Sequence, residues 1–547
     1  REPFGVPVRA PRLKRAVLQW LDLPVHRFHL LLKQVAETCE ALAGHEVVPH
    51  LLDAAEAAQR SLDWPSDTQN YIARTAPMPQ QQRIWELPEL VDRPAALDQG
   101  QRASVTAAHE ALMGALKDLQ KQFPQQGELL LTGHAHIDLA WLWPYSETRR
   151  KMRRTFHTAV GLMDASDDYR FNQSTAQYYA QMEEDDPALL QQIKARVAAG
   201  QWEVIGGMWV EPDTNMPTGE SLTRQILYGQ RYFERHFGKR HTVCWLPDCF
   251  GFSGAMPQLL KQGGIDSFFT IKVNWSETNR IPVDLFWWEG VDGSRVLAHT
   301  FENPHGGYNG ELQPDAYLKT WQRFKSKALH GTSLLAVGYG DGGGGTTPEM
   351  VEREVQLRDF PVLPKARWGH VADYFSGAHE ASKDVKLPVW SGEIYLELHR
   401  ATLTTQSGVK RMHRQAERAL ITAETAASLA HLLGASAPTS LEPQWRVVLK
   451  NEFHDILPGS SIREVYQDAE SELGAVINAG KAAQLTALDA IAAQLPRGVG
   501  AGLLVVNPSL SVRRIGATEQ TVPPLGVAVV AHDLPAKSGL KVSTGHL

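Results

Sequence analysis

The stretch that decides the fold is ELLLTGHAHIDLAWLWP, residues 128–144. Its short apolar start predicts a buried strand, and the strand runs into His134, His136 and Asp138, followed at once by two tryptophans. An ordinary strand-to-loop junction needs neither imidazole and carboxylate side chains nor two indoles. The residues after this strand are therefore the first place to look for a functional site.

From residue 128 onward, short apolar runs alternate with runs that have helical periodicity. This spacing predicts βαβ units and a parallel sheet covered by helices, an α/β fold. In such sheets functional groups gather beyond the carboxyl ends of the strands. Three polar motifs occupy that position: HAHID (134–138), WLPDCFG (245–251) and YGDGGGG (339–345).

The chain has 547 residues, too many for one compact core, and its pattern changes three times. The parts that we expect are a helical region (1–125), an α/β catalytic domain (126–372), a helical bundle (373–497) and the beginning of a β-domain (498–547).

Composition excludes several functional classes. The charged fraction is 21%, with 55 Lys and Arg against 61 Asp and Glu, and no basic run predicts a nucleic-acid or anionic-membrane partner. No apolar run reaches the ~20 residues of a membrane helix. The three cysteines form an odd number without CxxC spacing, which favours a reducing compartment. No signal peptide opens the chain, so we expect a cytoplasmic protein.

His136 and Asp138 form the first candidate metal site. Residues two apart on extended chain point to the same side, and imidazole with carboxylate suits zinc or another divalent ion. The alternative is a polar loop whose histidines cap backbone groups. The sequence alone leaves both interpretations open.

Asp248 is the second candidate, because it directly follows an apolar run and is surrounded by aromatic residues. A poorly solvated carboxylate needs a partner to stay ionised, and a metal ion would provide one. The alternative is a cap for the helix that begins near Met256.

Two further motifs contain acidic residues. His454 and Asp455 precede the turn PGSS (458–461), but adjacent His-Asp is common by chance. Asp341 lies in GYGDGGGG (338–345), which formally matches a dinucleotide-binding pattern. Its charge would repel a pyrophosphate, so we instead interpret this loop as holding a carboxylate close to a bulky ligand.

Tryptophans are frequent near these carboxylates, and flat indole faces beside hydroxyl-binding groups are what a sugar ring requires. Filling of a large core is the alternative role for several of them. The tryptophans concerned are Trp141, Trp143, Trp209, Trp245, Trp275, Trp287 and Trp288.

Five motifs occur in an order that resembles glycoside hydrolase family 38, the α-mannosidases, and within it the bacterial and cytosolic-vacuolar branch. The motifs are GHAHIDLAWLWP, WLPDCFGFSGAMPQ, GYGDGGGG, SGEIYLELHRATLTTQ and NEFHDILPGSSI. The resemblance implies a seven-stranded parallel α/β barrel, a three-helix bundle and the beginning of a β-sandwich domain. It also implies a retaining mechanism with one divalent metal ion, usually zinc, acting on mannose-containing oligosaccharides.

Carried over by position, the resemblance implies a role for each motif residue. The implied metal ligands are His136, Asp138, Asp248 and His454. Asp248 would also be the nucleophile, with Asp341 as the candidate acid and Glu393 and Glu397 as fallback acids. Trp141 would lie under the sugar, Asp455 would bind a sugar hydroxyl, and His134 would support the ligands.

Two other functions remain open at this point. An amidohydrolase-type metal enzyme also begins with HxH after a barrel strand, and a sugar-binding protein without activity would keep the tryptophans. Linkage preference, metal identity and homo-oligomerisation are left open. Members of the resembled family continue through further β-domains, so we expect a part of a longer enzyme or an incomplete one.

Overall fold

The computed structural model describes residues 21–63, 97–301, 309–495, 502–515 and 520–531. The chain forms two units. One contains residues 1–126, 312–318 and 352–365, and the other contains the remainder.

The first unit is built on helices α1 (Leu23–Ala41), α2 (Val47–Arg60) and α5 (Gln99–Gln122), which pack on one another. The start of α5 follows from capping chemistry. The side chain of Asp98 accepts the backbone N–H of Gln101, whose own side chain accepts the N–H of Asp98. The predicted helical character of this region is found in its described residues.

The second unit contains two five-stranded sheets. The strands of the first are β1 (Glu128–His134), β2 (Phe171–Gln173), β3 (Trp202–Val204), β8 (Thr332–Val337) and β9 (Lys365–Trp368). Their order is β3-β2-β1-β8, with β9 also paired to β1. Strand β1 runs parallel to both β2 and β8. Leu129, Leu130 and Leu131 are fully buried, as expected for a strand covered on both faces.

The second sheet has the order β10-β6-β7-β5-β4. Its strands are β4 (Val243–Trp245), β5 (Ser267–Thr270), β6 (Leu285–Glu289), β7 (Arg295–Thr300) and β10 (Val389–Ser391). Strands β6 and β7 are antiparallel, because the short turn between them, closed by a hydrogen bond from Gly290 N to Ser294 O, permits no crossover. Phe268, Phe286 and Trp288 belong to the apolar core of this sheet.

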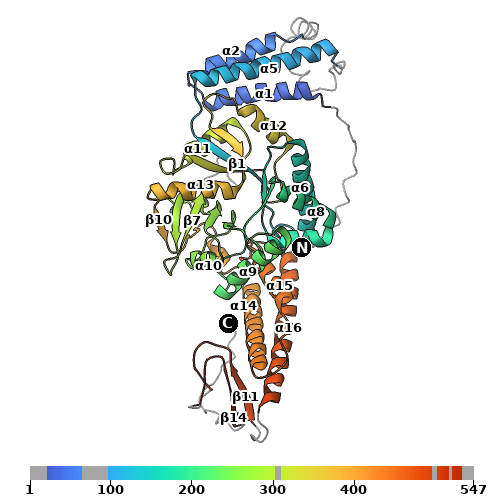
Figure 1. The fold of residues 1–547 in the computed structure, drawn as a ribbon, viewed down its shortest axis with the longest axis vertical. Coiled ribbons are helices and arrows are strands. Elements are labelled where there is room, and N and C mark those ends of the chain that lie inside the picture. Colours follow the sequence, from blue (N-terminus) through green and yellow to red (C-terminus); the bar gives the residue numbers. More distant parts are fainter. Residues whose placement is uncertain (1–20, 64–96, 302–308, 496–501, 516–519, 532–547) are drawn as a thin grey trace, which may run out of the picture. The chain divides into compact units, whose positions relative to one another are not determined.

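Helices connect these strands in the second unit and continue after them. Those between the strands are α6 (Tyr145–Ala165), α7 (Ala176–Asp185), α8 (Pro187–Ala198), α9 (Gly219–Phe237), α10 (Met256–Gln262), α11 (Pro314–Arg323), α12 (Pro348–Leu357) and α13 (Val371–Asp384). The residues of α11 and of α12 are divided between the two units. After the strands, α14 (Ser407–Leu432), α15 (Glu442–Asn451) and α16 (Arg463–Gln494) pack on one another, and α14 and α16 run side by side (Figure 1).

Short strands follow the last helix. They pair as β11 (Gly502–Asn507) with β14 (Gly526–Ala531) and as β12 (Arg513–Arg514) with β13 (Thr521–Val522). Among the described residues, no helix combines the length and the hydropathy needed to cross a membrane.

The α/β fold with parallel strands is confirmed. The closed seven-stranded barrel stays a prediction, as does the four-part division of the chain. Strand pairing continues beyond residue 372, because β10 is parallel to β6. In the first sheet Gly133 is in register with Val337, so the segments after β1 and β8 emerge next to each other. This register determines where the polar motifs meet.

Candidate active site

Four side chains from three distant segments meet in a buried cluster. The ligand atoms of His136, Asp138, Asp248 and His454 all lie within 4.8 Å of one another, and all four residues are buried. Nε2 of His136 is 3.1 Å from Oδ1 of Asp138 and 3.4 Å from Oδ2 of Asp248. Nε2 of His454 is 3.4 and 3.5 Å from the same two oxygens. The two imidazoles therefore direct the same nitrogen toward the same pair of carboxylates.

The composition of this cluster fits a divalent metal ion. Nε2 of His454 is buried and has no hydrogen-bond partner among the described residues, although it faces two carboxylates. A buried nitrogen without a hydrogen bond is costly unless it binds something else. Two imidazole nitrogens with two carboxylate oxygens suit zinc and similar first-row divalent ions.

Glu211, which the sequence analysis missed, contacts both histidines. Its Oε2 lies 3.5 Å from Nδ1 of His136, and its backbone oxygen lies 3.1 Å from Nδ1 of His454. Burial raises the pKa of the Glu211 carboxyl, and the nearby histidines oppose that effect. The available signal was an acidic residue in the apolar stretch GGMWVEPD, residues 206–213.

Lys272 is the second residue that the sequence analysis missed. Its Nζ lies 2.6 Å from Oδ1 of Asp248 and 4.1 Å from the ring centre of Trp275. Burial raises the pKa of Asp248, but Lys272 and the two histidines outweigh burial and hold that pKa well below its ordinary value. Lys272 and the two histidines thus favour the ionised form of Asp248.

The glycine-rich loop after β8 lies against the segment that follows β1. The backbone oxygen of Asp341 accepts the N–H of Asp138 at 2.8 Å, and Gly343 N donates to His136 O at 3.1 Å. Asp341 has a φ of 32°, in the left-handed region that a non-glycine residue rarely adopts. Its side chain is half-buried, and burial raises the pKa of its carboxyl, an effect that Asp138 and Asp248 reinforce and His136 opposes.

Of the two predicted substrate contacts, Asp455 lies beside the cluster, and Trp141 follows Asp138 by three residues in the sequence. Asp455 is buried, its Oδ2 is 3.7 Å from Nε2 of His454, and Ser460 donates to its Oδ1. Burial, with the charge of Asp138, raises the pKa of Asp455 to about 8. Trp141 is half-buried, and its backbone oxygen accepts the N–H of Ile462 at 2.8 Å. The segment after His454 therefore packs against the segment after Asp138.

Other candidate residues are outside the four-residue cluster, although the ring centroid of His134 is 6.5 Å from that of His136. Nδ1 of His134 is 3.2 Å from Asn172 O, and its Nε2 accepts from Trp245 Nε1 at 3.3 Å, so both ring nitrogens are occupied. The carboxylate of Glu397 accepts hydrogen bonds from the backbone N–H groups of Thr278 and Asn279, which gives this side chain a structural role.

Glu393 is exposed. Trp209, Trp245 and Trp288 are at most 2% exposed, so these three tryptophans fill the core.

A second His-Glu cluster, formed by His413, Glu417 and Glu452, also has ligand spacing. Its carboxylates are already bound by hydrogen-bond donors, including His413 on Glu452 at 2.8 Å and Thr218 on Glu417 at 2.8 Å. This cluster is consequently a hydrogen-bonded network that ties α14 to α15.

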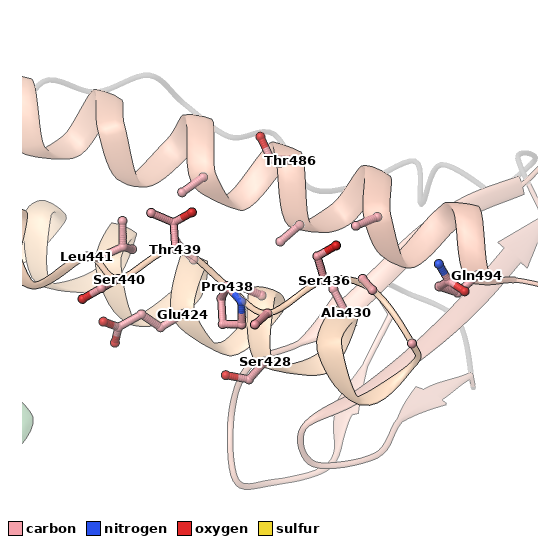
Figure 2. Close-up of a pocket in the computed structure, with 18 of the residues that line it drawn as sticks. Glu424, Ser428, Ala430, Ser436, Pro438, Thr439, Ser440, Leu441, Thr486 and Gln494 are labelled. Atoms are coloured by element: carbon pink, nitrogen blue, oxygen red, sulfur yellow. The ribbon is translucent and has the colours of Figure 1, made fainter.

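A groove of about 900 Å³ lies between α14, α16 and the loop 434–441 (Figure 2). Its wall is largely alanine, serine and threonine. The acidic group at this groove, Glu424, is bound by Arg224 at 2.6 Å and by Trp445 Nε1 at 2.9 Å. The residues that line this groove therefore form no set of metal ligands comparable to the cluster of His136, Asp138, Asp248 and His454.

Two protein-family profiles match the regions of the chain that hold the cluster. The profile "Glycosyl hydrolases family 38 N-terminal domain" matches residues 126–393, and "Alpha mannosidase middle domain" matches residues 397–491. His136, Asp138, Asp248 and Asp341 fall in the first match, and His454 falls in the second.

Several curated proteins are similar in sequence. "Alpha-mannosidase G" of Dictyostelium discoideum is 41% identical over 351 residues, which cover 64% of this chain and 32% of that protein. "Alpha-mannosidase 2C1" of Homo sapiens is 38% identical over 381 residues, covering 69% of this chain and 36% of that protein. The chain thus spans about a third of the length of the curated relatives it matches.

A solved structure shares the fold at lower identity. An alpha-mannosidase from Enterococcus faecalis superposes with a TM-score of 0.61 and 18% identity, covering 71% of this chain and 46% of that chain. With both profile matches and relatives near 40% identity, the chain belongs to glycosyl hydrolase family 38.

Proposed function

We propose that this chain carries the catalytic centre of a retaining, metal-dependent α-mannosidase that removes terminal α-linked mannose from oligosaccharides. One observation carries the proposal. Asp248 places one carboxylate oxygen on Lys272 and the other toward the Nε2 atoms of His136 and His454. The names of the relatives support the substrate class. Family membership leaves the amidohydrolase alternative without support.

We propose that His136, Asp138, Asp248 and His454 hold one divalent ion, zinc. When bound, the ion would supply positive charge that orients sugar hydroxyls and favours the ionised form of Asp248. The ligand set supports this proposal through its two imidazole nitrogens and two carboxylate oxygens.

Asp248 is the nucleophile in this proposal. Its low pKa keeps it ionised, so a lone pair of its carboxylate can form a bond to the anomeric carbon of mannose as the glycosidic bond breaks. Water later breaks the resulting ester and regenerates Asp248. Two displacements on the same carbon retain its configuration.

Asp341 is the proposed acid and base. Burial raises its pKa, which favours a protonated carboxyl that can donate to the leaving oxygen in the first step. In the second step the same carboxylate accepts a proton from the attacking water. Trp141 would stack under the sugar ring, and Asp455 would accept a hydrogen bond from a sugar hydroxyl.

The remaining finer expectations belong to the same proposal. We propose that both sheets are parts of a seven-stranded barrel, followed by a three-helix bundle and a β-sandwich. We also propose that the protein acts in the cytoplasm. None of the three cysteines forms a disulfide, which supports a reducing compartment.

The proposal is tested by incubating the purified chain with an aryl α-mannoside before and after chelation. We expect release of the aglycone, loss of release after chelation and recovery with added divalent ion. The first-formed sugar, observed by NMR, should have the α-configuration. Full hydrolysis by protein shown to be metal-free would contradict the metal role, and a first-formed β-anomer would contradict retention.

A further inference from the structure

Glu211 contacts both imidazoles of the candidate metal centre on their Nδ1 side. The residue is 2% exposed and follows β3 in the segment before α9. Its side chain faces His136, with Oε2 3.5 Å from Nδ1, and its backbone oxygen faces His454, 3.1 Å from Nδ1. One residue thus contacts the non-ligand nitrogen of both histidines.

These contacts have a chemical consequence. A neutral imidazole carries one proton, and an oxygen acceptor at Nδ1 keeps the proton there and leaves the lone pair on Nε2. In both histidines Nε2 is the atom directed at Asp138 and Asp248. The two rings are stacked, with centroids 5.4 Å apart and planes 17° apart, so they are held in nearly the same orientation.

The backbone around Glu211 is itself fixed. Pro212 forms an antiparallel bridge with Phe453, His454 N donates to Glu211 O at 3.2 Å, and Asp213 N donates to Glu452 O at 2.8 Å. The side chain of Glu211 is also held, because the hydroxyl of Ser174 donates to its Oε1. Movement of Glu211 would therefore displace His454 as well as the acceptor of His136.

We infer that Glu211 is a positioning residue that sets the tautomer and the orientation of both histidines, so that the affinity of the centre for a divalent ion depends on it although it is not a ligand. This inference rests on the proposed metal-dependent function. The competing interpretation is that Glu211 only stabilises the fold as a buried partner of His136. The two differ in what they predict for metal affinity.

Two substitutions separate charge from geometry. Glu211→Gln keeps an oxygen that can face Nδ1 of His136 but removes the negative charge, and Glu211→Met removes that oxygen at similar size. Removal of a side chain that supports a metal ligand typically weakens metal binding 10–100-fold. We expect Zn²⁺ affinity to fall about tenfold for Glu211→Gln and about 100-fold for Glu211→Met.

Glu203→Gln is the matched control. Glu203 is also buried, on β3, but its carboxylate accepts the backbone N–H groups of Val371 and Ala372, at 2.7 and 2.9 Å. Its substitution should lower the temperature of unfolding and leave Zn²⁺ affinity unchanged.

Affinity is measured by competition with a chromogenic chelator, and Co²⁺ absorption spectra report the ligand geometry. Wild-type affinity in folded Glu211→Met protein would overturn the inference, as would an equal loss in Glu203→Gln. If Glu211→Met does not fold, the Zn²⁺ affinity of Glu211→Gln decides instead, and wild-type affinity in that variant would overturn the inference. If the unmodified chain binds no Zn²⁺ at all, the proposed metal centre fails together with the inference, whereas intact wild-type binding with unaffected variants refutes the role of Glu211 alone.

Discussion

Nζ of Lys272 lies 2.6 Å from Oδ1 of Asp248, while the other oxygen of that carboxylate faces Nε2 of His136 and of His454. One oxygen of the Asp248 carboxylate therefore pairs with a lysine, and the other faces the two histidines of the cluster. Strands β4 and β5 are parallel neighbours, and Asp248 and Lys272 follow their carboxyl ends. The pairing of these two strands brings the cation to the carboxylate.

Removal of this cation should change the pH dependence of hydrolysis. Lys272 lowers the pKa of Asp248, so Lys272→Met should raise that pKa, and the proposed nucleophile will stay protonated up to a higher pH. We expect the acidic limb of the kcat/KM profile to move upward by about one pH unit or more. Lys272→Arg keeps the charge and is the control. An unmoved limb in Lys272→Met would contradict this role.

Loss of the proposed acid should depend on the leaving group. Asp341→Asn cannot transfer a proton, so we expect kcat for an oligosaccharide to fall about 10²–10⁴-fold. A dinitrophenyl mannoside needs little protonation, and its first step should be nearly unaffected in a burst measurement. In the unmodified protein, activity should decrease as pH rises through the raised pKa of Asp341. Equal losses on both substrates would refute the assignment.

Metal affinity should increase with pH. Burial alone lowers the pKa of both histidines, but other groups outweigh burial and raise both values well above the ordinary one. For His136 these groups are Glu211 and the two aspartates of the cluster, and for His454 they are Cys249 and the same two aspartates. A metal ion must displace these protons. Affinity should therefore fall as pH decreases, by about tenfold per pH unit for each displaced proton. Chelator competition across the neutral range measures the slope, and pH-independent affinity would contradict the prediction.

The two neighbouring tryptophans should differ in their effects. Trp141 is half-buried and is the proposed sugar platform, whereas Trp143 donates from Nε1 to Thr148 at 2.9 Å. Trp141→Ala should raise KM for an aryl mannoside by about tenfold, because a stacking surface is lost. Trp143→Ala should mainly lower the unfolding temperature. Steady-state kinetics with thermal unfolding distinguishes them, and an unchanged KM in Trp141→Ala would exclude the platform role.

Much of the fold was predictable because local signals are strong where strands are buried and helices amphipathic. Apolar runs predicted β1 and β8, and the placement of polar motifs after strands predicted that His136, Asp138 and Asp248 lie near strand ends. Their assembly with His454 required the family resemblance, since adjacent His-Asp pairs have no spacing signal. The cluster brings together all four of these residues.

Glu211 and Lys272 were not predictable in the same way. Their importance depends on which segments become neighbours across the sheets, and no periodicity in the sequence records that pairing. Several tryptophans were also ambiguous, since a large ring serves a core and a sugar platform equally well. Trp245 stacks on Phe269 with centroids 4.0 Å apart, an arrangement that only the pairing of β4 with β5 creates.

The contact between Glu211 and His454 joins residues that are 243 positions apart. During synthesis the α/β segment therefore emerges from the ribosome long before His454, the fourth proposed ligand, has been made. Domains fold as units during synthesis, the N-terminal ones first. Loading of the ion should accordingly be a late event in the life of the nascent chain, completed only after α15 has been translated and has docked.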